Sequence, residues 1–487
     1  MTNAGPKQAA AQLREILALL STAVEKVARK WEGAPDGDDA HSSEPRDYVN
    51  AQSSYDPTKT ALAALGSIES LITDPYRLLI NMSTSYLVSR ALHIVADHDI
   101  AAVLARTGDD RGVHVTELAK VTGLDKGKLC RIMRALTSHH IFQEVEEDTF
   151  ANNHISKVLA GDPAFRAHIM MKGRVHYTAS DHLPAVLSDA QSRSYDPQKT
   201  AFQQAVGTGL SIFDWMNKEV PADDTDWRAG TMSQSSVPQP SPSADGLNDA
   251  AIVKMVPRPE KKLFHQAMAG LDRGSGHFYL HDYPWWELGG GTVVDVGGGI
   301  GSFCMELHER YPDLHLVVQD RTPVIQQAIS TWEAKFPKAL PEGKVELMPH
   351  DFFKPNPVLH ADVYWLRYIA HDWPDAKVQE ILNNVACSMT PSSRLLIADV
   401  VVVTTLGCPE IASAPAPLLA NYGKASAYAH MMDMNMMAMV DGRERTPNEF
   451  SKLVEGSRLE IVRIWQGRGA DTLGIVECRL AYERSVR

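Results

Sequence analysis

Short apolar runs alternate with amphipathic segments along the C-terminal half of the chain, from about residue 290 onward. Because strands and helices alternate there, we expect a parallel sheet with helices on both faces. The expected strands lie near residues 292–296, 314–319, 344–348, 361–366, 395–403, 459–465 and 473–482. The expected helices lie near residues 301–311, 322–330, 374–389, 426–440 and 447–455. Only a short turn separates the last two strands, so we expect them to pair antiparallel.

The N-terminal half is dominated by apolar residues at helical spacing. Residues 11–30 predict one amphipathic helix, and the polar residues 31–57 predict a linker. A threonine and an aspartate followed by a proline, at residues 73–75, predict the start of a second helix. The apolar spacing continues this helix through Ile94.

A glycine between two helical patterns makes residues 114–156 typical of a winged helix. Two helices flank Gly123, and two short strands follow near residues 141–145 and 149–152. Mainly helical patterns continue over residues 160–218 and 259–270. Read alone, the basic second helix of this segment could be a DNA-recognition helix.

A segment rich in serine and proline, residues 231–250, contains almost no large apolar side chain. Such a segment cannot bury enough surface to offset its chain entropy, so we expect a disordered insertion. We therefore predict four parts of the chain: an N-terminal helix and linker at 1–72, a winged-helix domain at 73–219, the insertion at 220–250 and the α/β domain at 251–487.

Composition narrows the classes of function. The 48 Lys and Arg residues against 60 Asp and Glu give a net charge of −12, which argues against a large nucleic-acid-binding surface and against adhesion to anionic membranes. The longest dense apolar run, residues 395–403, is about half of what a membrane span needs. The first 17 residues lack the apolar stretch of a signal peptide. Five scattered cysteines without a CxxC indicate a reducing compartment, and we expect the cytoplasm.

The glycine-rich segment VVDVGGGIGSF, residues 293–303, is the strongest local signal. An apolar strand ends in Asp295, and Gly297, Gly299 and Gly301 then lead into a helix whose N-terminus offers free N–H groups to a ligand. Asp320 ends the next strand, where a carboxylate can accept both hydroxyls of a ribose. The nicotinamide fingerprint GxGxxG would need a glycine where Ser302 stands, which weakens that interpretation without removing it.

Further motifs follow the glycine loop in order: LHLVVQD (314–320), VELMPHDFF (345–353), RYIAHDWPD (367–375), LLIADVVV (395–402) and GRERTPNEF (442–450). With the loop and the winged-helix segment, they resemble the class I S-adenosylmethionine-dependent O-methyltransferases. The likeness is to the plant caffeate/flavonoid type and its fungal relatives in secondary metabolism, and it covers roughly residues 74–482. It implies a Rossmann-like domain with a seven-stranded, mostly parallel sheet and an N-terminal, mainly α winged-helix dimerisation domain, hence a homodimer.

The resemblance implies S-adenosylmethionine as the cofactor and assigns residues to it. The glycine loop would face the methionine part, Asp320 the ribose, and Asp351 and Phe352 the adenine. Arg367 stands where the family commonly has lysine, which keeps the charge but changes the shape of the donor. The full set of expected cofactor-binding residues is Asp295, Gly297, Gly299, Gly301, Asp320, Asp351, Phe352 and Arg367.

Methyl transfer to a phenol needs a base, because a phenol with a pKa near 10 is almost un-ionised at neutral pH. Histidine suits this task. Among 19 histidines, His371 follows a predicted strand and precedes a helix, so it lies at the carboxyl end of the sheet, where ligands bind. The resemblance also matches it to the catalytic histidine of the family.

Two acids are candidate partners of this histidine, since a carboxylate can fix its tautomer and stabilise the imidazolium. Asp399 lies inside an apolar strand and is either such a partner or a structural acid satisfied by a backbone cap. Glu444 matches the second acid of the family; the alternative is a surface salt bridge with Arg443 or Arg445.

The methionine-rich segment at residues 427–442 corresponds to the region where the family builds its acceptor pocket. A methionine stripe at helical spacing is more often core, but flexible thioethers also suit a flat aromatic acceptor. The expected acceptor contacts are Phe264, Met268, Met432 and Met436. We expect no metal site, because a metal-dependent enzyme would need a closer cluster of acids.

Three functions remain open from the sequence. The first is methyl transfer from S-adenosylmethionine to a phenolic or polyketide-type hydroxyl of a small aromatic natural product, with His371 as the base. The second is a methyltransferase-like protein that uses the bound cofactor for a non-methylating reaction. The third is a winged-helix regulator that senses the cofactor, with a nicotinamide oxidoreductase more distant still.

Overall fold

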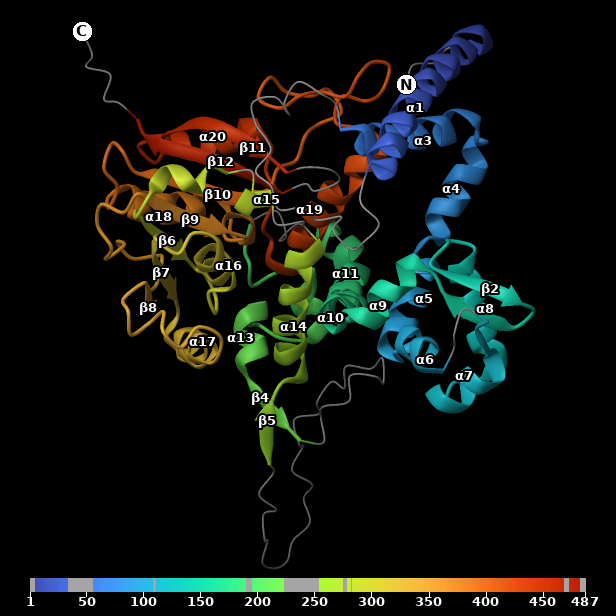
Figure 1. The fold of residues 1–487 in the computed structure, drawn as a ribbon, viewed down its shortest axis with the longest axis horizontal. Coiled ribbons are helices and arrows are strands. Elements are labelled where there is room, and N and C mark those ends of the chain that lie inside the picture. The colour runs from blue at the N-terminus through green and yellow to red at the C-terminus, as the bar shows by residue number, and fades with distance from the viewer. Residues whose placement is uncertain are drawn as a thin grey trace, which may run out of the picture. The chain divides into compact units, whose positions relative to one another are not determined.

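The computed structural model describes residues 5–33, 56–107, 111–189, 195–222, 254–274, 278–281, 283–467 and 473–481 (Figure 1). By its contacts the chain divides into two compact units. The first comprises residues 1–78, 275–437 and 441–487, and the second comprises residues 79–274 with 438–440.

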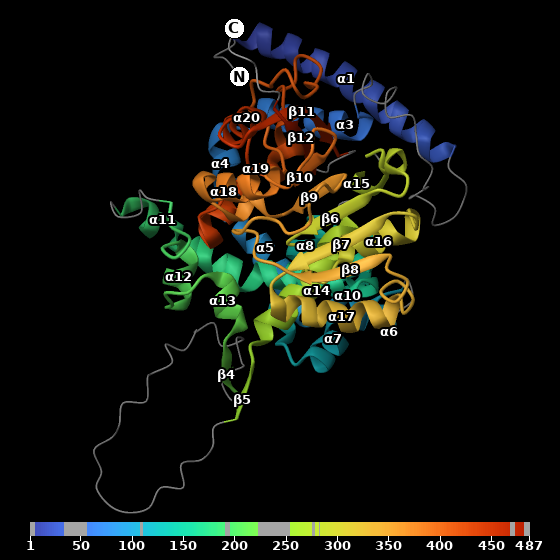
Figure 2. The ribbon, with the colours of Figure 1, turned by 90° about the vertical axis from the view of Figure 1, so that its left-hand side faces the viewer.

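The first unit is built on a seven-stranded sheet with the order β11-β12-β10-β9-β6-β7-β8, which Figure 2 shows from top to bottom. The strands are β6 (Thr292–Val296), β7 (His315–Asp320), β8 (Val345–Pro349), β9 (Val363–Arg367), β10 (Arg394–Val400), β11 (Leu459–Gln466) and β12 (Leu473–Leu480). Strands β6 to β10 pair parallel, and β12 pairs antiparallel with both β10 and β11. All seven strands and the antiparallel end of the sheet are therefore confirmed.

Alternate residues of the strands face two separate apolar cores. Val293 packs into one core with side chains of α16 and α17, whereas Val294 packs into the other with side chains of α18 and α20. The alternation follows from the pleat, which points successive side chains to opposite faces. The helices are α15 (Phe278–His281), α16 (Ser302–Arg310), α17 (Thr322–Lys335), α18 (Asp375–Ala386), α19 (Ala427–Val440) and α20 (Pro447–Glu455), with 3-10 turns η4 (Trp285–Leu288), η5 (Ala370–Asp372) and η6 (Gly423–Ser426).

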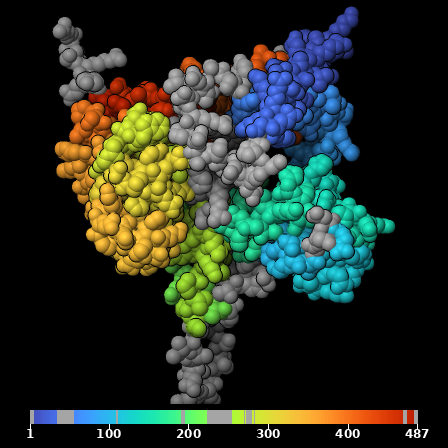
Figure 3. Space-filling model, viewed as in Figure 1, coloured from blue at the N-terminus to red at the C-terminus, as the bar shows by residue number. Residues whose placement is uncertain are grey.

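Two N-terminal helices, α1 (Pro6–Glu32) and α3 (Pro57–Ile72), belong to the same unit as the sheet. They pack with the segment that follows β10, through Ile16, Ala64, Leu418 and Tyr422. Helix α1 lies on the outside of the unit (blue in Figure 3) and confirms the helix predicted there. The sequence did not predict α3, whose buried side chains are small; most of the predicted linker, residues 34–55, lies outside the described residues.

The second unit holds the helix–turn–helix and the two strands predicted over residues 114–156. Gly123 closes α7 in the left-handed region, at a φ of 73°. The hairpin strands are joined by a third, in the order β1-β3-β2. The elements of this region are α5 (Tyr86–Asp97), α6 (Ile100–Thr107), β1 (Val113–His114), α7 (Val115–Thr122), α8 (Lys126–Thr137), β2 (Phe142–Glu146) and β3 (Thr149–Asn152).

The remaining elements of the second unit are mainly helical, as predicted. They are α9 (His154–Gly161), α10 (Pro163–Met171), the π-helix η1 (Lys172–His176), α11 (Tyr177–Ser188), α12 (Ala201–Val206), α13 (Ile212–Asn217), β4 (Glu219–Pro221), β5 (Met255–Pro257) and α14 (Pro259–Gly274). The expected disordered insertion, residues 231–250, lies outside the described residues.

The long helix expected from residue 73 through Ile94 is wrong as a single helix. Helix α4 (Pro75–Thr84) ends, and α5 begins at Tyr86. The hydroxyls of Ser83 and Thr84 donate to the carbonyl of Ile80 at 2.8 and 3.1 Å. Such local bonds compete with the helical ladder and weaken or bend the helix at this point.

The two units differ from the predicted domain boundaries in two places. Helices α1 and α3 group with the sheet because they pack on the segment after β10. Helix α14 groups with the helical unit because Leu263 and Ala267 pack on Ala167 and Met171 of α10. Within the described part of the chain, no helix is both long and apolar enough to cross a membrane.

Candidate active site

Backbone hydrogen bonds connect the glycine loop after β6 to the end of the neighbouring strand β7. The N–H groups of Gly297 and Gly298 both donate to the carbonyl of Gln319, at 2.8 and 3.0 Å. Gly301 has a φ of 84°, and a Cβ there would lie 2.7 Å from Nε1 of Trp332. Only glycine fits this position, because both the conformation and the space exclude a side chain.

The carboxylates of Asp320 and Asp295 lie beside the loop. Asp320 accepts the N–H of Gly299 at 2.9 Å and that of Arg321 at 2.7 Å. Burial raises the pKa of Asp320, while these two backbone donors act in the opposite direction. Each carboxylate oxygen can accept more than one hydrogen bond, so Asp320 keeps capacity for ribose hydroxyls. Asp295 is buried beside the loop and accepts a weak bond from Sγ of Cys304 at 3.6 Å.

The predicted adenine-side residues lie on the turn after β8. A Cβ placed on Gly297 would lie 3.6 Å from the ring of Phe352, so the structure brings these two residues together. Asp351 is exposed on the same turn and accepts the N–H of Phe353 at 3.1 Å. The guanidinium of Arg367 lies 5.0 Å from the ring centre of Tyr279, a cation–π arrangement that lysine would make less well.

His371 lies in η5, directly after β9, at the carboxyl edge of the sheet. Its Nδ1 is 3.0 Å from Oε1 of Glu444, and its Nε2 is 3.6 Å from Oδ1 of Asp372. Burial alone would lower the pKa of His371, but the charges of Glu444, Asp372 and Asp399 outweigh it and raise the pKa to about 10. The site therefore stabilises the imidazolium strongly.

The structure distinguishes the two acids proposed as partners of this histidine. Glu444 is 4% exposed and bonds the ring, so a surface salt bridge is the wrong interpretation. Arg443 and Arg445 pair with Asp375 instead. Asp399 is 1% exposed, and among the described residues neither of its carboxylate oxygens has a hydrogen-bond partner. The backbone cap that the structural alternative required for Asp399 is therefore absent from this part of the chain.

Burial raises the pKa of Asp399 to about 6, against the attraction of His371 and with further help from Glu444. The pKa of Asp372 rises to about 6 as well, again chiefly through burial. Three acids thus surround one imidazole, and burial raises the pKa of two of them, Asp372 and Asp399.

Sequence reasoning missed two residues that support this cluster. Asp433, in α19, accepts the N–H of Glu444 at 2.9 Å. Arg445 is 1% exposed and contacts the turn that carries His371. The motif GRERT pointed to the segment but not to the burial of Arg445, and nothing in the local pattern pointed to Asp433.

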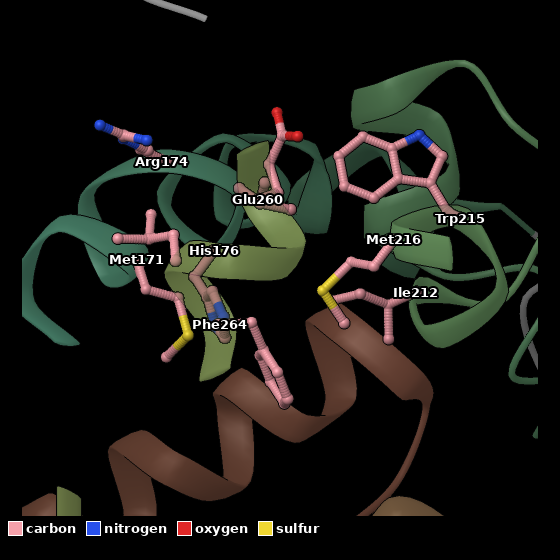
Figure 4. A pocket seen from close by; sticks show the side chains of 10 residues that line it. Met171, Arg174, His176, Ile212, Trp215, Met216, Glu260 and Phe264 are labelled. Atoms are coloured by element: carbon pink, nitrogen blue, oxygen red, sulfur yellow. The ribbon is translucent and has the colours of Figure 1, made fainter. Parts of the chain in front are cut away.

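The expected acceptor contacts fall in both units. Met432 and Met436 are half-buried on α19 in the first unit. In the second unit, Phe264 and Met268 pack against the cluster around Met171. Phe264 also lines a cavity of about 20 Å³, enough for about one water molecule. Figure 4 shows this cavity, which is lined by Met171, Arg174, Val175, His176, Ile212, Trp215, Met216, Glu260, Leu263 and Phe264.

No group of three or more His, Cys, Asp or Glu side chains in the described ranges could hold a metal ion.

Comparisons with known proteins decide the family. A sequence profile described as an O-methyltransferase domain matches residues 257–458. The chain is 38% identical to O-methyltransferase gedA of Aspergillus terreus, over 95% of this chain and 96% of the relative. It is 36% identical to O-methyltransferase tpcA of Aspergillus fumigatus, over 95% of each chain. The chain belongs to the S-adenosylmethionine-dependent O-methyltransferases.

Solved structures share the fold of this O-methyltransferase at lower identity. OxaC in complex with sinefungin and meleagrin matches with a TM-score of 0.65 and 20% identity, over 96% of this chain and 99% of that one. LepI in complex with S-adenosylmethionine matches with a TM-score of 0.62 and 21% identity, over 96% and 99%. These likenesses confirm the predicted fold class.

S-adenosylmethionine is the cofactor of this O-methyltransferase, and the residues present fit it. A side chain at Gly301 would collide with Trp332, so packing against the protein itself requires glycine at this end of the loop. Gly299 has a φ of 61° and open space where a Cβ would lie. Asp320 offers its carboxylate beside the loop, and Phe352 borders Gly297. When bound, the cofactor supplies an activated methyl group on a sulfonium.

Proposed function

We propose that this O-methyltransferase methylates a phenolic or polyketide-type hydroxyl of a small aromatic natural product, with His371 as the general base. The observation that carries the proposal is the 3.0 Å contact between Nδ1 of His371 and Oε1 of Glu444, at the carboxyl edge of the sheet. This contact is the arrangement in which a carboxylate orients an imidazole for proton transfer.

The charges around His371 support the removal of a proton from a weakly acidic hydroxyl such as a phenol. With Nδ1–H donated to Glu444, Nε2 of His371 is the atom that accepts the acceptor's proton. Burial lowers the pKa of His371, but the charges of Glu444 and Asp372 outweigh it and raise the pKa above its usual value, so the cluster stabilises the imidazolium that forms once the ring has taken the acceptor's proton. Burial of the cluster excludes water, which strengthens these electrostatic interactions.

The acceptor contacts proposed on α19 are Met432 and Met436. They lie on the same helix as Asp433, whose carboxylate holds the backbone of Glu444. Thioethers at these positions provide a polarisable surface suited to an aromatic ring. On the second unit, we propose Phe264 and Met268 as contacts, since both are apolar side chains that are only partly buried against the cluster around Met171.

We further propose that the protein is a homodimer. Helix α4 has no buried residue, and it exposes large apolar side chains: Tyr76 is 80% exposed, Leu79 67% and Met82 68%. Large exposed apolar side chains on successive turns of one helix are typical of an interface between proteins. Light scattering should give twice the chain mass, and a Leu79→Asp, Met82→Asp variant should give the monomer mass.

We propose the cytoplasm as the location. All five cysteines are free, and three of them are buried. Buried thiols without disulfides are typical of a reducing compartment.

The function is tested with purified wild type and His371→Ala. Titration with S-adenosylhomocysteine measures cofactor binding, and transfer of a labelled methyl group to a panel of hydroxylated aromatics measures activity. We expect His371→Ala to lower kcat by roughly 100- to 10,000-fold while cofactor affinity stays within about twofold.

Two results would contradict the proposal. A fully active His371→Ala variant would remove the general base. Intact cofactor binding with no methyl transfer to any hydroxylated aromatic would favour the alternatives, a non-methylating reaction or a regulator.

A further inference from the structure

Arg445 is the one arginine among the largest fully buried side chains of the described residues, at 1% exposure. A buried guanidinium is costly unless its donors are satisfied. Here Nη1 donates to the carbonyl of Ala370 at 2.7 Å, and Nη2 donates to the carbonyl of Trp373 at 2.8 Å. These two carbonyls lie on either side of His371 in the chain, so one planar side chain spans the whole turn.

The charge of Arg445 is balanced by Asp375. Its Nε and Nη2 both donate to Oδ1 of Asp375, at 3.0 and 2.8 Å. Asp375 is the first residue of α18, where the positive end of the helix favours a carboxylate. The pair therefore ties the turn to the start of a helix packed on the sheet.

The segment 442–445 contacts the same turn at each of its four residues. A Cβ on Gly442 would collide with the carbonyl oxygen of His371, so the two backbones touch there. The N–H of Arg443 donates to that carbonyl at 2.9 Å. Glu444 bonds the imidazole ring, and Arg445 bonds the carbonyls around it. The ring and its backbone are thus held by neighbouring residues.

We propose that Arg445, balanced by Asp375, is a positioning residue that holds the 370–373 turn and thereby sets the ring of His371 against Glu444. The inference rests on the proposed role of His371 as the base. A hydrogen bond to Glu444 orients the ring only while the backbone that carries the ring stays in place. A displacement of about 1 Å at a reacting group costs about 100-fold in rate.

The test uses Arg445→Lys, which keeps the charge but loses the planar fork, and Asp375→Asn, which removes the balancing charge. The matched control is Arg394→Lys, because Arg394 is also largely buried and bonds Tyr283 and Glu287, but at the amino end of β10. We expect both site variants to lower kcat by roughly 10- to 100-fold, with cofactor affinity within about twofold of wild type. The control should lose thermal stability without losing kcat.

A second readout separates positioning from mere stability. We record the pH dependence of kcat and the titration of the His371 imidazole by NMR, assigned through its loss in His371→Ala. Loosening the contact with Glu444 should move both midpoints to lower pH in the two site variants and leave them unchanged in Arg394→Lys. If Arg445→Lys does not fold, Asp375→Asn carries the test alone.

The outcomes distinguish this inference from the proposed function. Site variants with wild-type kcat and midpoints, beside an inactive His371→Ala, would overturn the positioning role and leave the base intact. An active His371→Ala would remove the proposed base, whereas the NMR titration would still show whether Arg445 orients the ring.

Discussion

The glycine loop and the cluster around His371 follow adjacent strands, β6 and β9, at the same edge of the sheet, but they are built in opposite ways. The loop is shaped by backbone: positive φ angles at Gly297, Gly299 and Gly301, and N–H groups donated to the end of β7. The cluster is shaped by charge, with Glu444, Asp372 and Asp399 gathered around one imidazole.

This difference predicts different responses to mutation. Changes in the loop act through steric fit and should appear as lost cofactor affinity. Changes in the cluster act through charge and should appear in rate and in pH dependence, because burial lets each acid influence its neighbours strongly.

The largest expected effect is that of Glu444→Gln, which removes the carboxylate from the ring while keeping its shape. We expect kcat to fall by at least about 100-fold, because an amide no longer selects the tautomer or stabilises the imidazolium. The midpoint of the kcat/KM profile should move to lower pH, because Glu444 is among the groups that raise the pKa of His371. Glu477→Gln is the control, since Glu477 is equally buried at 4% but bonds Trp465. Unchanged kcat in Glu444→Gln would contradict the claim that the charges around His371 determine the rate.

The next effect is that of Gly301→Ala on the loop. The added Cβ meets Nε1 of Trp332 at 2.7 Å, so the loop backbone must shift, at a cost of about 1–3 kcal/mol. Because the shifted loop fits the cofactor less well, we expect binding of S-adenosylhomocysteine, measured by calorimetry, to weaken by roughly 5- to 150-fold. Gly343→Ala is the matched control, because Gly343 also has a positive φ, 67°, but has open space. Equal affinities of the two variants would show that space at Gly301 does not determine binding.

A smaller effect is expected in stability for Asp399→Asn. Burial raises the folded-state pKa of Asp399 from 3.8 to about 6, so the folded state binds the proton more tightly than the unfolded state. Wild type therefore loses stability as the pH rises from 4 through 6, and asparagine, which does not ionise, avoids this loss. We expect a gain of at most about 3 kcal/mol at pH 7.5, and little at pH 4, in the free energy of unfolding by urea. An equal change at both pH values would argue against an ionised Asp399.

The smallest effect is expected for Met436→Leu, a substitution of similar volume. We expect the KM for the acceptor to change by about two- to threefold, with cofactor affinity unchanged. Met434→Leu is the control, because Met434 is 48% exposed on the same helix. The same KM change in both variants would exclude a specific contact by Met436.

Much of the fold followed from local patterns. The seven strands, the helices between them, Gly123 at its turn and His371 at a strand end were all predicted within a few residues. Local sequence suffices here because alternation, helical spacing and glycine conformations are properties of neighbouring residues. The break between α4 and α5 and the existence of α3 were missed, since serine side chains and small apolar residues give weak signals.

The sequence by itself determined the glycine loop, the identity of the histidine and the set of candidate acids. Only the tertiary structure decided that Glu444, 73 residues from His371, bonds the ring and that Asp399 lacks a hydrogen-bond partner among the described residues. It also decided that Arg445 is buried rather than on the surface. The physical reason is that burial and pairing of charges depend on which distant segments the sheet brings together, and no local pattern records that.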